Sequence, residues 1–180
     1  MAKKLTPRGK ALRWLTNHRG LTEQPAGSNW DNRKDGIAAA IKRCGFTFPV
    51  PWCGVWHYNA LRAAGVKGIS SRQASVALIE DDARAKRAPY SHGWLPSPAR
   101  TGKHWKSVFR GDAVVLFGYG VHVETLRDCS WRYRMLGVIV TDAGNTSSGV
   151  TGSQSNGGGS YKRKRRISDI RGIARVDFPG

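Results

Sequence analysis

Hydrophobic residues in the first half of the chain recur at the spacing expected of helices. Residues 53–65 (CGVWHYNALRAAG) place their apolar side chains on one helical face and end at a glycine, which predicts a helix. A second helix is predicted over residues 70–87, capped by Ser70 or Ser71, and another begins around Ile37. The first half of the chain is therefore predicted to be helical.

After residue 111 the pattern changes to that of β-strands. Three short β-branched segments are separated by turn signals, as in an antiparallel meander: DAVVLFGYG (112–120), VHVETLRD (121–128) and RMLGVIVTD (134–142). A last strand is predicted at 172–178, whereas 90–111 and the Gly-rich segment 145–160 are predicted as loops. Because helices come first and strands follow, the sequence predicts an α+β fold with N-terminal helices packed on a small antiparallel sheet.

The domain organisation follows from length and local composition. A chain of 180 residues that is 39% hydrophobic suits one compact domain. Residues 1–20 are predicted as a basic N-terminal arm or helix, and residues 21–180 as a single domain that opens with a loop rich in turn formers at 21–36.

Charge limits the choice of partner. Lys and Arg total 30 against 12 acidic residues, a formal net charge of +18, which indicates an anionic partner such as nucleic acid, a membrane surface or a cell wall. The basic residues are spread along the chain, with the densest run, YKRKRR, at 161–166, and no usual nucleic-acid-binding signature is present. The diffuse charge therefore fits loose attraction to a polyanion better than the reading of a base sequence, and we expect the dense run to anchor the protein rather than to perform chemistry.

The chain contains no apolar run of the ~20 residues that cross a bilayer and no hydrophobic stretch near its start that would act as a signal peptide. We therefore expect no membrane span and synthesis in the cytoplasm, so that a target outside the cell must be reached by another route.

Three cysteines, Cys44, Cys53 and Cys129, form an odd number without C-x-x-C spacing, which argues against a zinc site or a disulfide framework. Cys53 follows a proline-rich approach and begins a predicted helix, where unpaired N–H groups and the helix dipole favour a thiolate. The alternative is an inert, buried cysteine, the commoner fate of a lone thiol.

His122 is the candidate general base. In VHVET, strand alternation places His122 and Glu124 on one face and the two valines on the other. An imidazole held beside a helix start can take the proton of a thiol and later give one to a leaving amine. Asn145 is our first choice for the residue that orients the imidazole and Asp142 the second; the two would lie on opposite faces of a regular strand, and a bulge at residues 143–144 would undo that parity.

Several segments together resemble the CHAP family, the cysteine- and histidine-dependent amidohydrolases and peptidases of phage endolysins and bacterial wall hydrolases. The resemblance extends from Thr22 to Pro179 and rests on TEQPAGSN, PWCGVWHYNALRAAGV, GDAVVLFGYGVHVETL, AGNTSSG, GSQSNGGGSYKRKRR and GIARVDFP. It implies a papain-like fold that hydrolyses a peptidoglycan amide bond through a thioester, with Cys53 as nucleophile and His122 as base.

The resemblance also bears on the remaining residues. Family members often carry Glu-Gly-Asn-Thr where this chain has Ala-Gly-Asn-Thr, which supports Asn145 as the orienting residue. Trp52, Glu23 and Asn29 lie in the matching segments and are expected to bind substrate. Some members hold calcium, but DNRKDG (31–36) offers too few ligands, so we expect no metal and no cofactor.

The resulting expectation is a monomeric amidase or endopeptidase, released at lysis or carried in a virion, that acts on peptidoglycan and anionic wall polymers. Two alternatives remain: a catalytically silent, wall-binding member of the same fold, and a basic nucleic-acid-binding protein whose cysteine and histidine are structural.

Overall fold

The computed structural model describes residues 4–101, 105, 108–118, 120–130, 135–146 and 158–180. Within these residues the helices are α1 (Pro7–Asn17), α2 (Ile37–Arg43), α3 (Cys53–Ala64), α4 (Val76–Arg84) and α5 (Pro98–Thr101), with short 3₁₀ helices η1 (Ser71–Ala74) and η2 (Ile167–Asp169). The strands are β1 (Trp94–Pro96), β2 (Ala113–Leu116), β3 (His122–Asp128), β4 (Val138–Thr146), β5 (Gly159–Arg166) and β6 (Ile170–Ala174).

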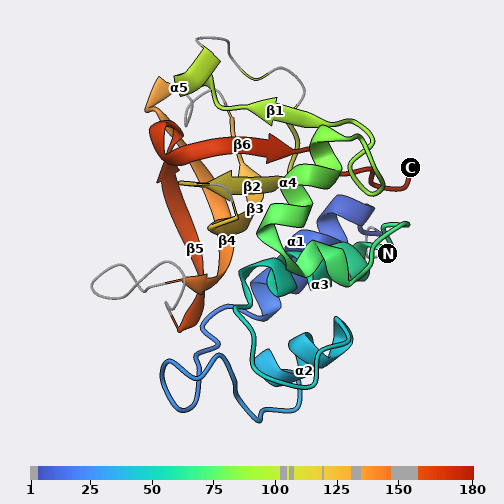
Figure 1. The fold of residues 1–180 in the computed structure, drawn as a ribbon, viewed down its shortest axis with the longest axis vertical. Helices are drawn as coiled ribbons and strands as arrows, with labels where there is room; N and C mark the ends of the chain where they lie inside the picture. Colours follow the sequence, from blue (N-terminus) through green and yellow to red (C-terminus); the bar gives the residue numbers. More distant parts are fainter. Residues whose placement is uncertain (1–3, 102–104, 106–107, 119, 131–134, 147–157) are drawn as a thin grey trace.

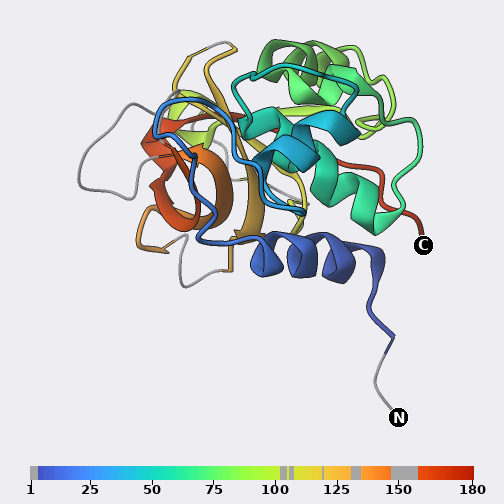
Figure 2. The same cartoon turned by 90° about the horizontal axis from the view of Figure 1, so that it is seen from below.

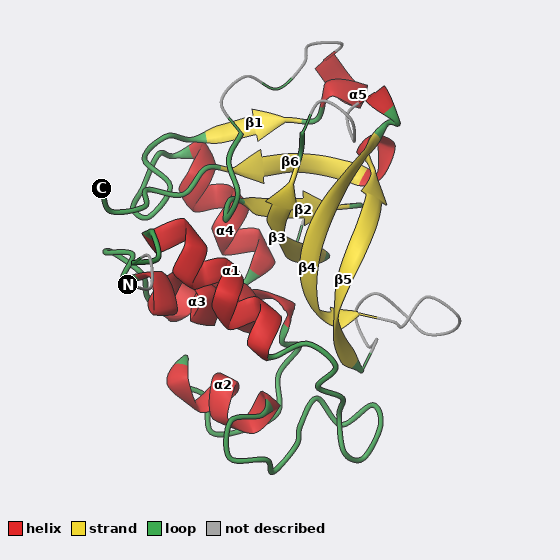
Figure 3. Ribbon diagram, turned by 180° about the vertical axis from the view of Figure 1, so that it is seen from behind, coloured by secondary structure: helices red, strands yellow, loops and turns green. Residues whose placement is uncertain are grey.

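The strands form one six-stranded antiparallel sheet in the order β1-β6-β2-β3-β4-β5. Helices α1, α3 and α4 gather on one side of this sheet, and α2 lies beyond α3 (Figures 1 and 3). Helix α1 lies alongside α3 (Figure 2), where the rings of Trp14 and Trp56 meet edge to face with centroids 4.9 Å apart. The α+β arrangement predicted from the sequence is therefore confirmed.

The hydrophobic core has two parts, one on each face of the sheet. The larger joins the helices to the inner face and includes Leu15, Leu61 and Val115, all essentially inaccessible to solvent. The smaller covers the opposite face and includes Leu116 and Leu126. Because both faces are covered at its centre, β2 is an unbroken run of four buried apolar residues.

The described residues refine the predicted elements. Of the two alternatives for residues 1–20, the structure has a helix, α1, which packs into the core through Ala11 and Leu15. The predicted helix at 70–87 is divided into η1 and α4, because the backbone of Ser75 is extended (φ −100°, ψ 123°). The predicted loop 90–111 contains β1 and α5, stabilised by pairing of β1 with β6.

The sequence prediction missed one long strand. The YKRKRR run belongs to β5, an edge strand paired with β4, and its exposed cations keep that edge polar. Residues 147–157 of the predicted loop 145–160 lie outside the described residues, while its ends belong to β4 and β5. Among the described residues, no helix combines the length and apolar character needed to cross a membrane.

Two glycines allow α3 to approach its neighbours closely. A Cβ at Gly144 in β4 would lie 2.6 Å from both Cβ and Cγ of Trp56. A Cβ at Gly54, the second residue of α3, would lie 2.2 Å from the carbonyl oxygen of Ala74 in η1. These contacts fix the start of α3 against β4 on one side and η1 on the other.

We predict that Gly144→Ala destabilises the protein by about 1–3 kcal/mol, the usual cost of overpacking a core, because the added methyl group collides with Trp56. Urea unfolding measures this change. The control is Gly9→Ala in α1, where the new methyl meets only side-chain atoms, the nearest 3.2 Å away at Thr6 Oγ1. Equal stabilities for the two variants would contradict the close packing of β4 on α3.

Candidate active site

Cys53 is the first residue of α3, and the residue before it anchors that position. Trp52 is fully buried, and its Nε1 donates a 2.8 Å hydrogen bond to Glu23 Oε1. Its ring also meets Trp56 edge to face, with centroids 4.9 Å apart. The thiol of Cys53 is thus held in the first turn of the helix, where unpaired N–H groups favour a negative charge.

The thiol interacts with His122, the first residue of β3. Cys53 is 5% exposed and His122 is fully buried. Burial raises the pKa of the thiol and lowers that of the imidazole, but their mutual hydrogen bond and charge interaction outweigh burial. Backbone N–H groups of Val123 and Gly54 assist, so the pKa of Cys53 falls below its ordinary value, while that of His122 rises to about 9. A thiolate–imidazolium pair is therefore favoured.

The second ring nitrogen of His122 is bound by Glu124, two residues along the same strand. His122 Nε2 lies 3.2 Å from Glu124 Oε1, and Nδ1 has no hydrogen-bond partner among the described residues, so Nδ1 is the ring nitrogen available to the thiol. Glu124 also accepts hydrogen bonds from Thr141 Oγ1 and from Arg165, whose Nε lies 2.9 and 3.0 Å from the two carboxylate oxygens.

The charge state of Glu124 follows from these contacts. Burial acts to raise the pKa of this carboxyl, but the hydrogen bonds and positive charges of His122 and Arg165 lower it to about 2. Glu124 is therefore ionised at neutral pH, and it can both hold the ring orientation of His122 and stabilise the imidazolium.

Arg165 comes from the basic run in β5. Strand alternation exposes Lys162, Lys164 and Arg166 but turns Arg165 inward, where it is 7% exposed. Its Nη2 also donates to Thr146 Oγ1 at 3.2 Å. The anchoring role expected for the whole run therefore does not extend to Arg165, whose charge is used inside the protein.

Asp142, our second choice as orienting residue, is bound on the other face of the sheet. It forms ion pairs with Arg19 and Arg127. In the β3–β4 ladder Glu124 pairs with Ala143, so the adjacent Asp142 points to the opposite face. The parity of the strand therefore directs this carboxylate away from the imidazole.

Asn145, our first choice, lies where β4 is irregular. The register against β5 shifts between Ala143 and Thr146, and Asn145 has a left-handed backbone with φ 53°, so the regular alternation along β4 is broken here. Its Nδ2 donates to Asn29 Oδ1 at 3.3 Å. Glu124 rather than Asn145 lies against His122 Nε2, so Glu124 is the candidate orienting residue in the structure.

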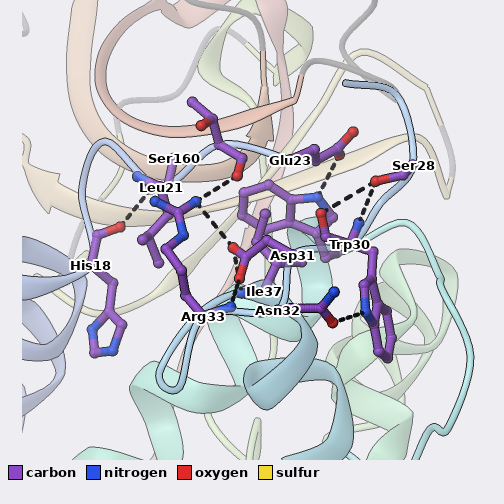
Figure 4. Close-up of polar contacts among 12 residues, drawn as sticks. His18, Leu21, Glu23, Ser28, Trp30, Asp31, Asn32, Arg33, Ile37 and Ser160 are labelled. Atoms are coloured by element: carbon purple, nitrogen blue, oxygen red, sulfur yellow. Dashed lines mark hydrogen bonds and ion pairs between the residues drawn. The ribbon is translucent and has the colours of Figure 1, made fainter. Parts of the chain in front are cut away.

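The three predicted substrate-binding residues are placed differently from expectation. Trp52 and Glu23 are 0% and 5% exposed and bond each other, so their side chains belong to the framework that holds α3 rather than to a substrate surface. Only Asn29 is partly exposed, and it lies beside Asn145. Figure 4 shows Glu23 within the polar network of the segment that precedes α2.

Asp31, in the segment compared with a calcium loop, is occupied by protein donors. It accepts hydrogen bonds from the backbone N–H groups of Arg33 and Ile37, at 2.8 and 3.1 Å, and pairs with the Arg33 guanidinium (Figure 4). Its role here is to hold the start of α2. Within the described ranges, no group of three or more His, Cys, Asp or Glu side chains could hold a metal ion.

Cys53 borders a cavity of about 620 Å³, a size that suits a small peptide segment. The cavity is formed by residues from the approach to α3, from η1 and the start of α4, and from the turn before β3. They are Phe46, Val50, Pro51, Cys53, Ser71, Arg72, Ala74, Ser75, Val76, Leu78, Gly120 and Val121. Most of these side chains are apolar, so the thiol borders a largely apolar groove.

The other candidate groups have structural surroundings. Burial raises the pKa of the Cys44 thiol to about 12, so it remains protonated. Cys129 donates a weak hydrogen bond to the Val108 carbonyl, with 3.8 Å between sulfur and oxygen. Burial lowers the pKa of His57 to about 3, and its Nδ1 lies 2.8 Å from Thr125 Oγ1 in the core.

Two residues of the site, Glu124 and Arg165, are absent from the sequence prediction. The alternation in VHVET already places Glu124 on the face of His122, so the signal for Glu124 was present. YKRKRR also alternates, but no pattern in the sequence indicates that its fifth residue meets Glu124.

Comparison with known proteins gives no relative. No protein-family model, no curated protein and no solved structure matches this chain.

We predict that iodoacetamide labels Cys53 selectively at pH 6, well below the pKa of an ordinary thiol. The pKa of Cys53 is lowered whereas that of Cys44 is raised to about 12, so the thiolate fraction of Cys53 should exceed that of Cys44 by several powers of ten. Peptide mass mapping after brief labelling measures both sites. Labelling of Cys53 that begins only above pH 8, or faster labelling of Cys44, would contradict the ion pair.

Proposed function

We propose that the protein is a cysteine hydrolase of the papain-like, CHAP type that cleaves an amide bond of bacterial peptidoglycan. The observation that carries this proposal is the arrangement of a helix-start thiol, Cys53, against a buried imidazole, His122, whose far nitrogen is held by Glu124. This is the combination of nucleophile, base and orienting group that thiol-dependent acyl transfer requires.

The proposed reaction has two halves. The Cys53 thiolate attacks the carbonyl carbon of the amide, and His122 donates its proton to the departing amine, which leaves a thioester on Cys53. Neutral His122 then takes a proton from water as the water attacks the thioester, and the acid product and thiolate are released. Glu124 remains ionised throughout and holds the imidazole in place, and Arg165 in turn holds Glu124.

The choice of peptidoglycan rests on the CHAP resemblance together with the charge. A net charge of +18 favours a polyanionic surrounding such as a wall that carries anionic polymers. The exposed cations of β5, Lys162, Lys164 and Arg166, suit this loose attraction. The proposed setting is a monomeric phage enzyme made in the host cytoplasm that meets the wall at lysis, or one carried in a virion.

The alternatives explain less of the site. A silent binding module or a nucleic-acid-binding protein needs no thiol with a lowered pKa. Neither of these functions requires a fully buried histidine between that thiol and a buried carboxylate. Burying such charges costs free energy, which is more readily understood where the charges act in catalysis.

The function is tested by digesting purified bacterial walls and identifying the released muropeptides by mass spectrometry. We predict new amino and carboxyl ends at one type of amide bond, and a loss of about 10⁴-fold or more in rate for Cys53→Ser. Cys44→Ser and Cys129→Ser serve as matched controls and should retain most activity. Release of the same ends by a folded Cys53→Ser variant, or no cleavage by the unaltered protein on any wall type, would overturn the proposal.

We further predict that Arg165→Gln shifts the alkaline limb of the pH–rate profile from about pH 9 toward lower pH. Without Arg165, His122 alone opposes the effect of burial on Glu124, so the pKa of Glu124 rises; the carboxylate, no longer held by the guanidinium, stabilises the imidazolium less, and the pKa of His122 falls. Arg165→Lys should partly restore the limb.

The matched control for this prediction is Lys164→Gln, which removes the same charge from the exposed face of the same strand. Lys164→Gln should leave the alkaline limb of the pH–rate profile unshifted. Because removing one partner of a buried ion pair can cost about 3–5 kcal/mol, the comparison is made at a temperature where circular dichroism shows both variants folded. An unshifted limb in Arg165→Gln would show that Arg165 has no influence on the base.

A further inference from the structure

The cavity beside Cys53 contains one charged side chain that the catalytic arrangement does not use. Among its described lining residues, Arg72 alone carries a permanent charge, and the other polar side chains there, besides the Cys53 thiol, are the hydroxyls of Ser71 and Ser75. The remaining lining is apolar. In its described part, the cavity lining therefore combines a nucleophile, apolar side chains and a single permanent cation.

Arg72 is held in a fixed orientation. Its Nε and Nη2 donate to the two oxygens of Asp82 at 3.0 and 2.7 Å, and Asp82 itself is only 1% exposed. Asp82 also binds a second arginine, Arg87, at 2.9 Å. The side chain of Arg72 is nevertheless 44% exposed, and its Nη1 makes no hydrogen bond with the described part of the chain. One edge of the guanidinium is thus anchored, and the Nη1 donors remain for a ligand.

The segment that carries Arg72 is rigidly placed against the nucleophile. A capping box closes η1: Ser70 N–H donates to Gln73 Oε1 at 2.7 Å, and the Ser70 side chain accepts from the backbone of the helix. The absence of a side chain at Gly54 lets the Ala74 carbonyl rest directly on the first turn of α3. The arginine and the thiol are therefore preorganised on two elements in direct contact.

We propose that Arg72 forms a carboxylate-binding subsite next to the scissile bond. The ligand class is a peptide amide that carries a free carboxylate near the cleaved bond, with small or apolar groups against the rest of the cavity. A planar guanidinium with free donors matches a carboxylate geometrically, and hydrogen bonds between two charged groups are shorter and stronger than those between neutral groups. This inference rests on the proposed function, because it takes Cys53 as the reacting group.

The test compares two alkylating reagents of nearly equal size, iodoacetate and iodoacetamide, which differ in one negative charge. The measured quantity is the ratio of their rates at Cys53. We expect Arg72→Gln to lower this ratio, iodoacetate over iodoacetamide, by about tenfold, which corresponds to the loss of one charge-assisted contact. The imidazolium of His122 attracts iodoacetate equally in both proteins and cancels in the comparison.

Arg87→Gln is the matched control, because it removes an arginine from the same Asp82 but lies outside the cavity lining. In Arg87→Gln the ratio of the iodoacetate rate to the iodoacetamide rate should stay near that of the unaltered protein. A ratio unchanged in Arg72→Gln, or lowered equally in Arg87→Gln, overturns the subsite. Failure of Cys53 to react with either reagent in the unaltered protein would instead remove the nucleophile, and with it both the proposed function and this inference.

A second measurement needs no variant and so holds even if Arg72→Gln does not fold. Glutarate, a small dicarboxylate, should slow iodoacetamide labelling of Cys53 in the unaltered protein in a saturable manner, whereas the uncharged diamide glutaramide should not. Equal protection by both compounds, or by neither, counts against a carboxylate site.

Discussion

The structure depends on a short chain of buried charges that alternate in sign from Cys53 through His122 and Glu124 to Arg165. A single buried ion would be costly, but each of these groups has an opposite charge on at least one side. The pairing explains why the pKa of His122 rises to about 9 although burial acts to lower it. It also explains why Glu124 remains a carboxylate inside the protein.

Three separate parts of the fold contribute to this chain: the start of α3, the strand β3, and the edge strand β5. The sheet brings β3 and β5 to either side of β4, whose Thr141 and Thr146 bond the carboxylate and the guanidinium respectively. Gly144 allows the same strand to lie directly against Trp56 of α3. Strand β4 therefore carries none of the reacting groups, yet it fixes the distances between the elements that do.

The sequence predicts local features well and long-range contacts poorly. The helix at Cys53, the strand at His122 and the bulge near Asn145 follow from periodicity and from turn chemistry, which are local. The orienting residue also has a local signal, because the alternation in VHVET places Glu124 on the face of His122, but the expectation fell on Asn145 and Asp142 in β4. Arg165 is harder to predict, because its role depends on the pairing of two strands separated by a long connection. A run of cations near the end of a chain is ordinarily a solvated surface.

The central claim is that Cys53 and His122 form a thiolate–imidazolium pair. An NMR titration of the His122 imidazole, with only histidine labelled, tests this claim most directly. The account predicts that the ring stays protonated to about pH 9 and that its pKa falls when Cys53 is replaced by alanine, because burial then acts with less opposition. A titration near pH 6.5, the value of an ordinary histidine, that is indifferent to the removal of Cys53 would contradict the account.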